Sequence, residues 1–448
     1  MTTISTPPVT DVTVLRDVVG VLEPADSQAG AIDRIRQLEE LKAACAAAQA
    51  RETASLAAMR AQDEAARGVA KARRGKGLDA EVGLARRDSP ARGARHVQLA
   101  QALSTDLPKT YAALSAGQVS EEQAQIVASE TSWLTSAHRQ KVDRLIAATL
   151  GTVGPRRLAA TVRFHAQHLD QHGAVARLAK ATSQRRVSVR PAPDNMAYLT
   201  ALVPMSQAVA CFAALRRDAT TMVGTGQTTD PTDPTGQPRI RDQIMADLFV
   251  QRVTGQHSAA AVPAEVQVVM TAESLFGDGQ TPAWLTGHGP IPTATAKTWL
   301  TNPEAQIFLR RVFTRPTDHQ LVGLESASRA FPAGLRRMII LRDDTCRTPY
   351  CDATIQHLDH LNPVRDGGTT SWDNASGLCA GCNQTKENTG WHHTGDPEQL
   401  NVTTPTGHCY TTNTTPVLPE IPSETRPPPP TSSTDCYTTP TPVITIAA

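Results

Sequence analysis

A chain of 448 residues is long for one compact domain and comfortable for two or three. Its formal net charge of +1 excludes a global positive field that would draw it to nucleic acid, so any attraction to DNA must come from local clusters. Eight cysteines in a chain of this size do not indicate a disulfide scaffold, and a reducing cytoplasm is the expected location. No apolar stretch approaches the length of a membrane span, and the first ten residues lack the pattern of a secretory signal.

Helical periodicity dominates the first part of the chain. Ile32, Ile35 and the apolar residues after them recur at helical spacing, which predicts one long helix over 29–70. We expect this helix to pack against other helices, with a dimerising coiled coil as the alternative. A capping box that begins at Ser120 opens a further helix, and more helical patterns follow it. Residues 12–180 are therefore predicted to form a mainly helical domain whose function the sequence does not define.

Two short helical patterns within that domain meet at a turn before residue 90. Ser89 suits an N-cap, and Pro90 suits the first position of the second helix. Arg92 and Arg95 would then share one face of this second helix. They either enter a DNA groove, as in a helix-turn-helix protein, or face water at an ordinary helical corner. Both interpretations stay open, and Arg92 and Arg95 are candidate nucleic-acid contacts.

The middle of the chain, 181–330, contains short β-branched stretches mixed with helical patterns. Two such stretches, 186–189 and 196–203, flank a turn rich in Pro, Asp and Asn, which is the pattern of a β-hairpin. A strand near 266–270 completes a small α+β region that continues the helical domain. Residues 394–448 are rich in Thr and Pro, a composition that cannot support a core, so we predict a disordered tail there.

Four cysteines form two close pairs ahead of that tail. Cys346 and Cys351 have the spacing Cys-x4-Cys, and Cys379 and Cys382 have the spacing Cys-x2-Cys. Two such pairs are typical of a tetrahedral zinc site. Four protein ligands leave no open coordination position, so we expect a structural zinc that holds together a segment too short to fold on its own core. The alternative is four unrelated thiols. The remaining cysteines are scattered and are expected to be free thiols: Cys45, Cys211, Cys409 and Cys436.

Between the two pairs lies Asp359-His360, which supplies a base for water and a ligand for a cation, the two needs of phosphodiester hydrolysis. His360 suits the base, because imidazole can be neutral near physiological pH. Asp359 and the amide oxygen of Asn383 suit a hard cation such as Mg2+, and Lys386 suits a phosphate. Alternation along a strand would direct Asp359 and His360 to opposite faces, whereas a twist or a bend near Pro363 would bring both to one site.

The flanks of this segment carry further candidates. Arg347, together with Arg336 and Arg337, is expected to grip DNA phosphates. Trp391 is expected to close a small core. The histidine pair that follows Trp391 is expected to be exposed, with assistance at the phosphate as the alternative.

This run of residues resembles the HNH endonuclease family in its zinc-bearing subgroup. The resemblance implies a ββα-metal fold, with the first motif His on a strand and the last His or Asn on a helix. By position, His360 matches the family's general base and Asp359 its neighbouring metal ligand. Asn374 matches the central Asn, which in the family orients the loop and the base. Asn383 matches the last motif position, where many members have His, so the implied cation, Mg2+ or Mn2+, would bind Asp359 and Asn383.

Segments further upstream resemble an actinobacterial group in which a helical domain of unknown function precedes the HNH module. The resemblance rests on residues 81–85, 107–108, 112–120 and 289–292. Tyr350 stands where that group usually has Gly, and His357 where it usually has an acidic residue. The resemblance also implies a setting of multicopy or mobile elements.

The predicted fold class is a mainly α N-terminal region with a small α+β middle part, followed by a ββα-metal HNH module over 331–393 and the tail. The predicted function is a metal-dependent DNA endonuclease or nickase, with DNA as its partner and no membrane association. One alternative is a zinc-stapled DNA-binding protein without catalysis. In another, residues 12–291 act as a scaffold for protein interaction or self-association rather than for DNA targeting.

Overall fold

The structure of the protein is a computed structural model. It describes residues 12–229, 237–255, 267–300, 308–313, 325–326, 330–414 and 442–447. The chain divides into two compact units, one formed by Met1–Gly75 with Arg95–Ala174 and the other by Lys76–Ala94 with Val175–Ala448. Within the described residues, no helix has both the length and the apolar character that crossing a bilayer requires.

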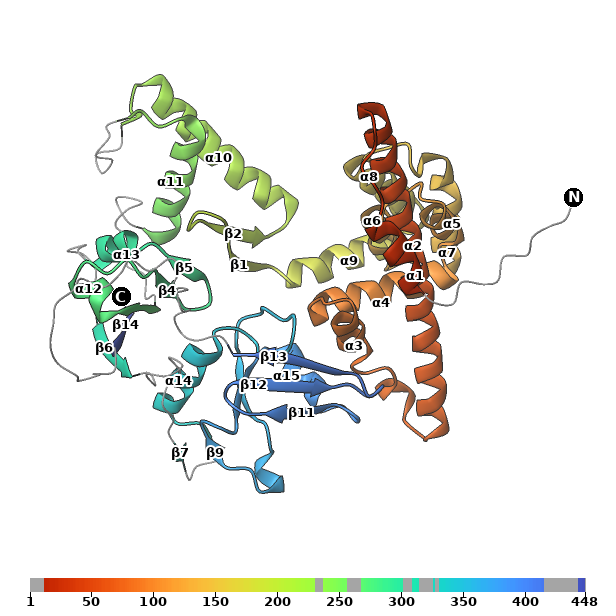
Figure 1. Cartoon of the computed structure of the whole chain (residues 1–448). Helices are drawn as coiled ribbons and strands as arrows, with labels where there is room; N and C mark the ends of the chain where they lie inside the picture. Colours follow the sequence, from red (N-terminus) through yellow and green to blue (C-terminus); the bar gives the residue numbers. More distant parts are fainter. Residues whose placement is uncertain are drawn as a thin grey trace, which may run out of the picture. The chain divides into compact units, whose positions relative to one another are not determined.

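The first unit consists of helices, as the sequence predicts, and its α-helices are labelled in Figure 1. In chain order the helices are α1 (Val12–Gly20), α2 (Gln28–Ala66), η1 (Lys71–Arg73), α4 (Pro90–Thr105), α5 (Pro108–Ser115), α6 (Glu121–Thr131), α7 (Ser136–Ile146), η2 (Ala147–Thr149), α8 (Pro155–Leu169) and α9 (Gln171–Ser183). Helices α4 and α9 each contain a boundary between the units. The predicted capping box is present at the start of α6, where Ser120 and Gln123 cap each other's backbone.

The long helix α2 packs through alanines rather than through its large apolar residues. Ala43 and Ala47 are buried in the core of the unit, together with Leu114 and Val127 from other helices. Ile32 and Ile35, which the sequence assigns to the packed face, are 67% and 63% exposed. Small side chains let helix axes approach closely, so the alanine stripe forms the contact and the isoleucines face outward.

The second unit begins with α3 (Leu78–Ala85) and continues after residue 175 with mixed elements. The predicted hairpin is formed by β1 (Arg186–Pro191) and β2 (Ala197–Leu202). The next elements are α10 (Met205–Gly224), α11 (Arg241–Thr254), β3 (Gln267–Thr271), α12 (Ala272–Phe276), β4 (Ala283–Leu285), β5 (Gly289–Ile291), α13 (Thr293–Leu300), β6 (Phe308–Phe313) and β7 (Glu325–Ser326). The last strand of the chain, β14 (Pro442–Ala447), pairs with β3 and β6, which gives a five-stranded sheet in the order β5-β4-β3-β14-β6.

A ββα element occupies the stretch that carries the cysteine pairs (Figure 1). Helix α14 (Ala333–Asp343) precedes it, followed by β8 (His357–His360), η3 (Val364–Asp366), β9 (Thr370–Ser371), β10 (Ala375–Leu378) and α15 (Ala380–Lys386). Strands β8 and β10 are antiparallel, with His360 opposite Ala375 and Asp359 opposite Ser376. Helix α15 packs against β8. The predicted ββα fold is therefore confirmed.

The ordered module extends beyond residue 394, where the sequence places the start of the tail. Strands β11 (His392–Gly395), β12 (Gln399–Thr403) and β13 (Cys409–Asn413) form an antiparallel sheet, and β14 follows later. The predicted boundary is wrong because composition hides the strand pattern: Leu400 and Val402 alternate with polar residues and are fully buried. The remaining tail residues, 415–441 and 448, lie outside the described residues.

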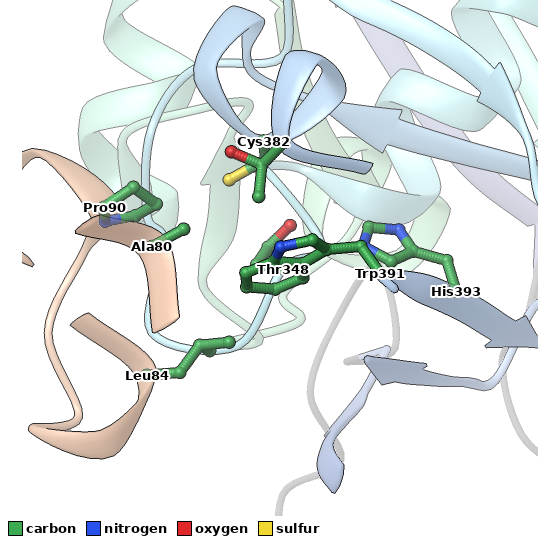
Figure 2. Close-up of a pocket in the computed structure, with 8 residues that line it drawn as sticks. Ala80, Leu84, Pro90, Thr348, Cys382, Trp391 and His393 are labelled. Carbon is green, nitrogen blue, oxygen red and sulfur yellow. The ribbon is translucent and has the colours of Figure 1, made fainter. Parts of the chain in front are cut away.

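Helix α3, far upstream in the sequence, completes the core of this module. Ala80 and Leu84 pack with Leu361, Trp391 and Leu400. Figure 2 shows Ala80 and Leu84 near Trp391, around a cavity of about 10 Å3 that has room for at most one water molecule. Gly77 is required just before α3, since its φ is +82° and a Cβ there would lie 2.7 Å from Trp391 Nε1. The burial of Trp391 confirms its predicted role in closing a small core.

Candidate active site and zinc site

The four paired cysteines converge on one point. Their Sγ atoms all lie within 4.8 Å of one another, and three of the four residues are buried, with Cys379 half-buried. Hydrogen bonds among the four thiols lower the pKa of Cys379 and raise the pKa of Cys351 and Cys382, which shows how closely the sulfur atoms approach one another. The sulfur set, its spacing and its closure fit a structural tetrahedral zinc site. The four predicted ligands come together as the spacing predicts, and the cluster indicates a structural zinc.

Local backbone geometry brings the two cysteine pairs together. The Cys351 amide donates to the Thr348 carbonyl, which makes the first pair a tight turn, and Tyr350 in that turn has a φ of +63°. Such a φ favours glycine, which is the residue that the related group usually has there. In the second pair, Cys379 caps α15, and its Sγ accepts a hydrogen bond from the Cys382 amide. The second pair thereby fixes the start of the helix that carries Asn383.

Asp359 and His360 leave β8 on opposite faces. Asp359 lies opposite Ser376 on the face turned toward α15 and Lys386, whereas His360 lies opposite Ala375 on the face turned toward α14. The structure therefore shows the alternation that a regular strand predicts, and no twist brings both side chains to one face. His360 is nevertheless the last residue of β8, so the two groups flank the end of the strand.

The imidazole of His360 is held by two neighbours that the sequence did not indicate. Its Nε2 lies 2.9 Å from Thr370 Oγ1 on β9. Its ring stacks on Phe331, with centroids 4.6 Å apart and an interplanar angle of 30°. Both contacts come from elements distant in sequence, and together they fix the orientation of the half-buried ring.

The carboxylate of Asp359 has a cationic partner. Lys386 Nζ lies 2.6 Å from Asp359 Oδ2, and the same ammonium donates to the carbonyl oxygen of His360. The sequence predicted that Lys386 would meet a phosphate, but its side chain is only 9% exposed in this ion pair. Asn383 lies one turn earlier on the same face of α15, and it is half-buried beside β8.

Asn374 ties down the loop that follows His360. Its side-chain amide donates to the carbonyl oxygens of Asn362 and Thr369 at 2.9 and 2.7 Å, and its Oδ1 accepts from the Asn362 amide at 2.7 Å. Gly368 is needed in this loop, because a Cβ there would lie 1.8 Å from the Asn362 carbonyl oxygen. The side chain of Asn374 is thus placed to orient the loop rather than to contact substrate.

The arginines that were predicted to contact DNA differ in their exposure to solvent. Arg347 is buried, and its guanidinium donates to the carbonyl of Asp396 and lies 3.7 Å from Asp343. Burial lowers the pKa of Arg347 to about 10, and the side chain has no route to a phosphate, so this prediction is wrong. Arg92 and Arg95 are exposed on α4, with Arg92 paired to Asp88 at 3.1 Å.

A buried charge cluster at the start of the module was missed from the sequence. Arg342 Nε lies 2.6 Å from Asp343 Oδ1, and both side chains have no exposed surface. The guanidinium also donates to the Trp372 and Ala375 carbonyls, while Asp343 accepts from the Gly377 amide. The cluster locks α14 to β10. Only the adjacency of an Arg and an Asp after an apolar run hinted at it.

One histidine of the terminal pair is also buried. His393 on β11 has 7% exposure, and its Nδ1 has no hydrogen-bond partner among the described residues. Burial, then the charge of Lys386, lowers the pKa of His393 to about 4, so this imidazole is neutral at physiological pH. The expectation that both histidines are exposed is wrong for His393, because alternation along β11 turns it inward.

A groove of about 700 Å3 borders the carboxylate site. It is lined by the loop after His360, by the end of α15 and by β11, and Asn374, Lys386 and His393 contribute to its wall. Arg365 and His392 add basic side chains to the same groove. The groove lies beside Lys386, the partner of Asp359, and is large enough for part of a macromolecule.

The fold and the four-thiolate site define the class of this protein as one that carries a zinc-stapled ββα nuclease-type module. Residues 35–343 match the model of a family described as a domain of unknown function (DUF222), and residues 345–389 match the HNH endonuclease family. The first match covers more than half of the chain, so the chain belongs to the DUF222 family, with an HNH domain that indicates a nuclease. Comparisons with curated proteins and with solved structures found no match.

Proposed function

We propose that this protein is a divalent-metal-dependent DNA endonuclease or nickase, with His360 as the general base. The observation that carries the proposal is the end of β8, where the His360 imidazole lies on one face and the Asp359 carboxylate on the other, and where Lys386, the partner of Asp359, lines a groove. In-line displacement at phosphorus places the attacking and leaving oxygens on opposite sides. Groups on opposite faces of a strand end suit that requirement, because each can serve one side of the phosphate.

His360 would remove a proton from the attacking water. The contacts with Thr370 and Phe331 support this role, since a base must be held in one orientation to act on a positioned water. Asn374 would act through the loop that carries Thr369 and Thr370, and is therefore a positioning residue. A base of this kind contributes about 10²- to 10⁴-fold in rate.

Asp359 and Asn383 would hold Mg2+ or Mn2+. One carboxylate and one amide oxygen form a donor set that fits these cations, which retain several waters and bind through few protein ligands. When bound, the cation would supply charge stabilisation for the phosphate and the leaving oxygen. The capping of α15 by Cys379 supports the fit, because the zinc site then fixes the helix that carries Asn383.

DNA is the proposed substrate, with phosphate contacts from exposed basic residues. Arg365 lines the groove, and Arg336 is exposed on α14. Arg92 and Arg95 on α4, far upstream of the module in the chain, remain candidate DNA contacts. We also propose a cytoplasmic location, because zinc binding requires reduced thiols. A mobile-element setting is part of the same proposal.

A non-catalytic DNA-binding protein is the second candidate, favoured by the ion pair that occupies Asp359. Gel-shift and plasmid-cleavage assays on the full chain, each with EDTA, Mg2+ or Mn2+, separate the two functions. We expect Mg2+- or Mn2+-dependent conversion of supercoiled plasmid, and its loss in Asp359→Asn with DNA binding retained. DNA binding without cleavage under any of these conditions would support the non-catalytic function instead.

A further inference from the structure

The contact between Lys386 and Asp359 is the closest charge pair at the candidate active site. The ammonium lies 2.6 Å from one carboxylate oxygen and also donates to the His360 carbonyl oxygen. It therefore touches both the candidate cation ligand and the backbone of the candidate base. Its side chain is 9% exposed and that of Asp359 is 25% exposed, so solvent screens the pair weakly.

A divalent cation bound by Asp359 would meet this ammonium at close range. Asn383 and Lys386 are three residues apart on one face of α15, and Lys386 on that face contacts the Asp359 carboxylate. Two positive charges that share one carboxylate repel each other, most strongly where water is scarce. Cation binding by Asp359 and the present position of Lys386 are therefore in competition.

The lysine has an alternative position within reach. Lys386 already contributes to the wall of the groove, beside Arg365 and His392. The neighbouring imidazole of His393 is buried, has no partner at Nδ1 within the described parts of the chain, and adds no opposing charge at neutral pH. A long, flexible ammonium that turns into this groove would meet a DNA phosphate there.

We propose that Lys386 is the internal cation of the Asp359 site: it holds the carboxylate until a divalent cation binds, and then moves into the groove to contact a DNA phosphate. This inference rests on the proposed function, because it assumes that Asp359 binds the cation. It makes cation loading and DNA binding mutually reinforcing. By thermodynamic linkage, DNA must then strengthen cation binding by the same factor by which the cation strengthens DNA binding.

The test measures Mn2+ binding by the full, zinc-loaded chain in a His360→Ala background, which keeps the DNA intact. Mn2+ is titrated with and without a short duplex, and free Mn2+ is followed by electron paramagnetic resonance. In Lys386→Met we expect Mn2+ to bind at least tenfold more tightly without DNA, and the strengthening by DNA to disappear. Lys386→Arg keeps a positive charge beside Asp359, so its Mn2+ affinity is expected to stay as weak as that of the protein with Lys386.

Arg365→Met is the matched control, since Arg365 lines the same groove without touching Asp359. It is expected to weaken DNA binding and to leave Mn2+ affinity unchanged. Equal or weaker Mn2+ binding by Lys386→Met, at unchanged zinc content, would overturn the inference, as would the absence of Mn2+ binding in every variant. If Lys386→Met tightens Mn2+ binding although the protein with His360 intact cleaves no DNA, the exchange stands and the nuclease proposal fails.

Discussion

The helical first unit and the nuclease module are stabilised by different interactions. The core of the first unit is one large cluster of Ala, Leu, Val and Ile side chains contributed mainly by helix α2 and by helices α4 to α8. The module divides its core among smaller clusters, one of which consists of the four cysteines and Leu378, and it buries Arg342 and Arg347. The first region also buries Asp143, but it contains no cysteine cluster among its described residues, whereas the second depends on a metal site and on a fully buried Arg342–Asp343 pair.

Size explains this difference. The HNH match spans only residues 345–389, and a segment that short cannot bury enough apolar surface to fold alone. The module also takes packing from outside the match, namely α14, α3 and the strands after Trp391. Interference with zinc, with buried charge and with local backbone should therefore affect the two regions unequally.

Removal of the zinc site gives the largest expected difference between the regions. Structural zinc contributes about 10–16 kcal/mol in small zinc domains, so Cys379→Ser should abolish the cooperative unfolding transition of the module. The first unit should keep its own transition, because its core contains no ligand of the cluster. Scanning calorimetry with zinc analysis measures both. Cys45→Ser, an exposed thiol on α2, serves as the control. If Cys379→Ser abolishes the unfolding transition of the first unit as well as that of the module, the two regions do not differ in their dependence on zinc.

Loss of the buried arginine comes next. Arg342→Met leaves Asp343 buried without its closest cationic partner, with only the more distant Arg347 guanidinium beside it, and loss of such a partner typically costs about 3–5 kcal/mol. The midpoint of the module's unfolding in urea should fall, while that of the first unit stays unchanged. Arg336→Met changes an exposed arginine on the same helix and should have little effect. Equal midpoints for the two variants would show that the cluster does not hold α14 to β10.

The loop anchor should affect activity more than stability. Asn374→Ala removes three hydrogen bonds around the loop after His360, at a cost of about 1–3 kcal/mol. We expect plasmid cleavage to fall roughly 10- to 100-fold at unchanged zinc content, since the base loses its fixed surroundings. Asn374→Asp keeps the acceptor oxygen but loses both donated hydrogen bonds. Its cleavage rate should lie between those of wild type and Asn374→Ala. Wild-type cleavage by Asn374→Ala would remove the positioning role.

The turn at Tyr350 gives the smallest expected effect, and one of opposite sign. A φ of +63° is strained for tyrosine, so Tyr350→Gly should stabilise the module by about 1 kcal/mol. Tyr350→Ala removes the ring but keeps a Cβ in the strained conformation, and it should bring no gain. Thermal midpoints of the zinc-loaded proteins compare the two. A thermal midpoint of Tyr350→Ala above that of wild type would indicate that the exposed ring, rather than the backbone conformation, is unfavourable.

The sequence predicted those features that depend on local spacing. The cysteine pairs, the ββα order and the helical first unit follow from residues close together in the chain, and each was found. The partners of Asp359 and His360 were missed, because Lys386 and Phe331 reach them only through tertiary packing. The docking of α3 joins residues more than 300 positions apart, as in the hydrogen bond from the Thr406 amide to Glu81. Local pattern carries no information about such contacts.

In the proposed nuclease, a strand end held by the zinc site presents the His360 imidazole to a phosphodiester. The most direct test measures cleavage of supercoiled plasmid and bound zinc in the same samples of wild type, His360→Ala and His357→Ala. His357 is an exposed histidine at the other end of β8 and provides the matched control. We expect one zinc per chain in all three proteins, with Mg2+- or Mn2+-dependent cleavage lost in His360→Ala alone. Cleavage by His360→Ala at the wild-type rate, with zinc in place, would contradict it.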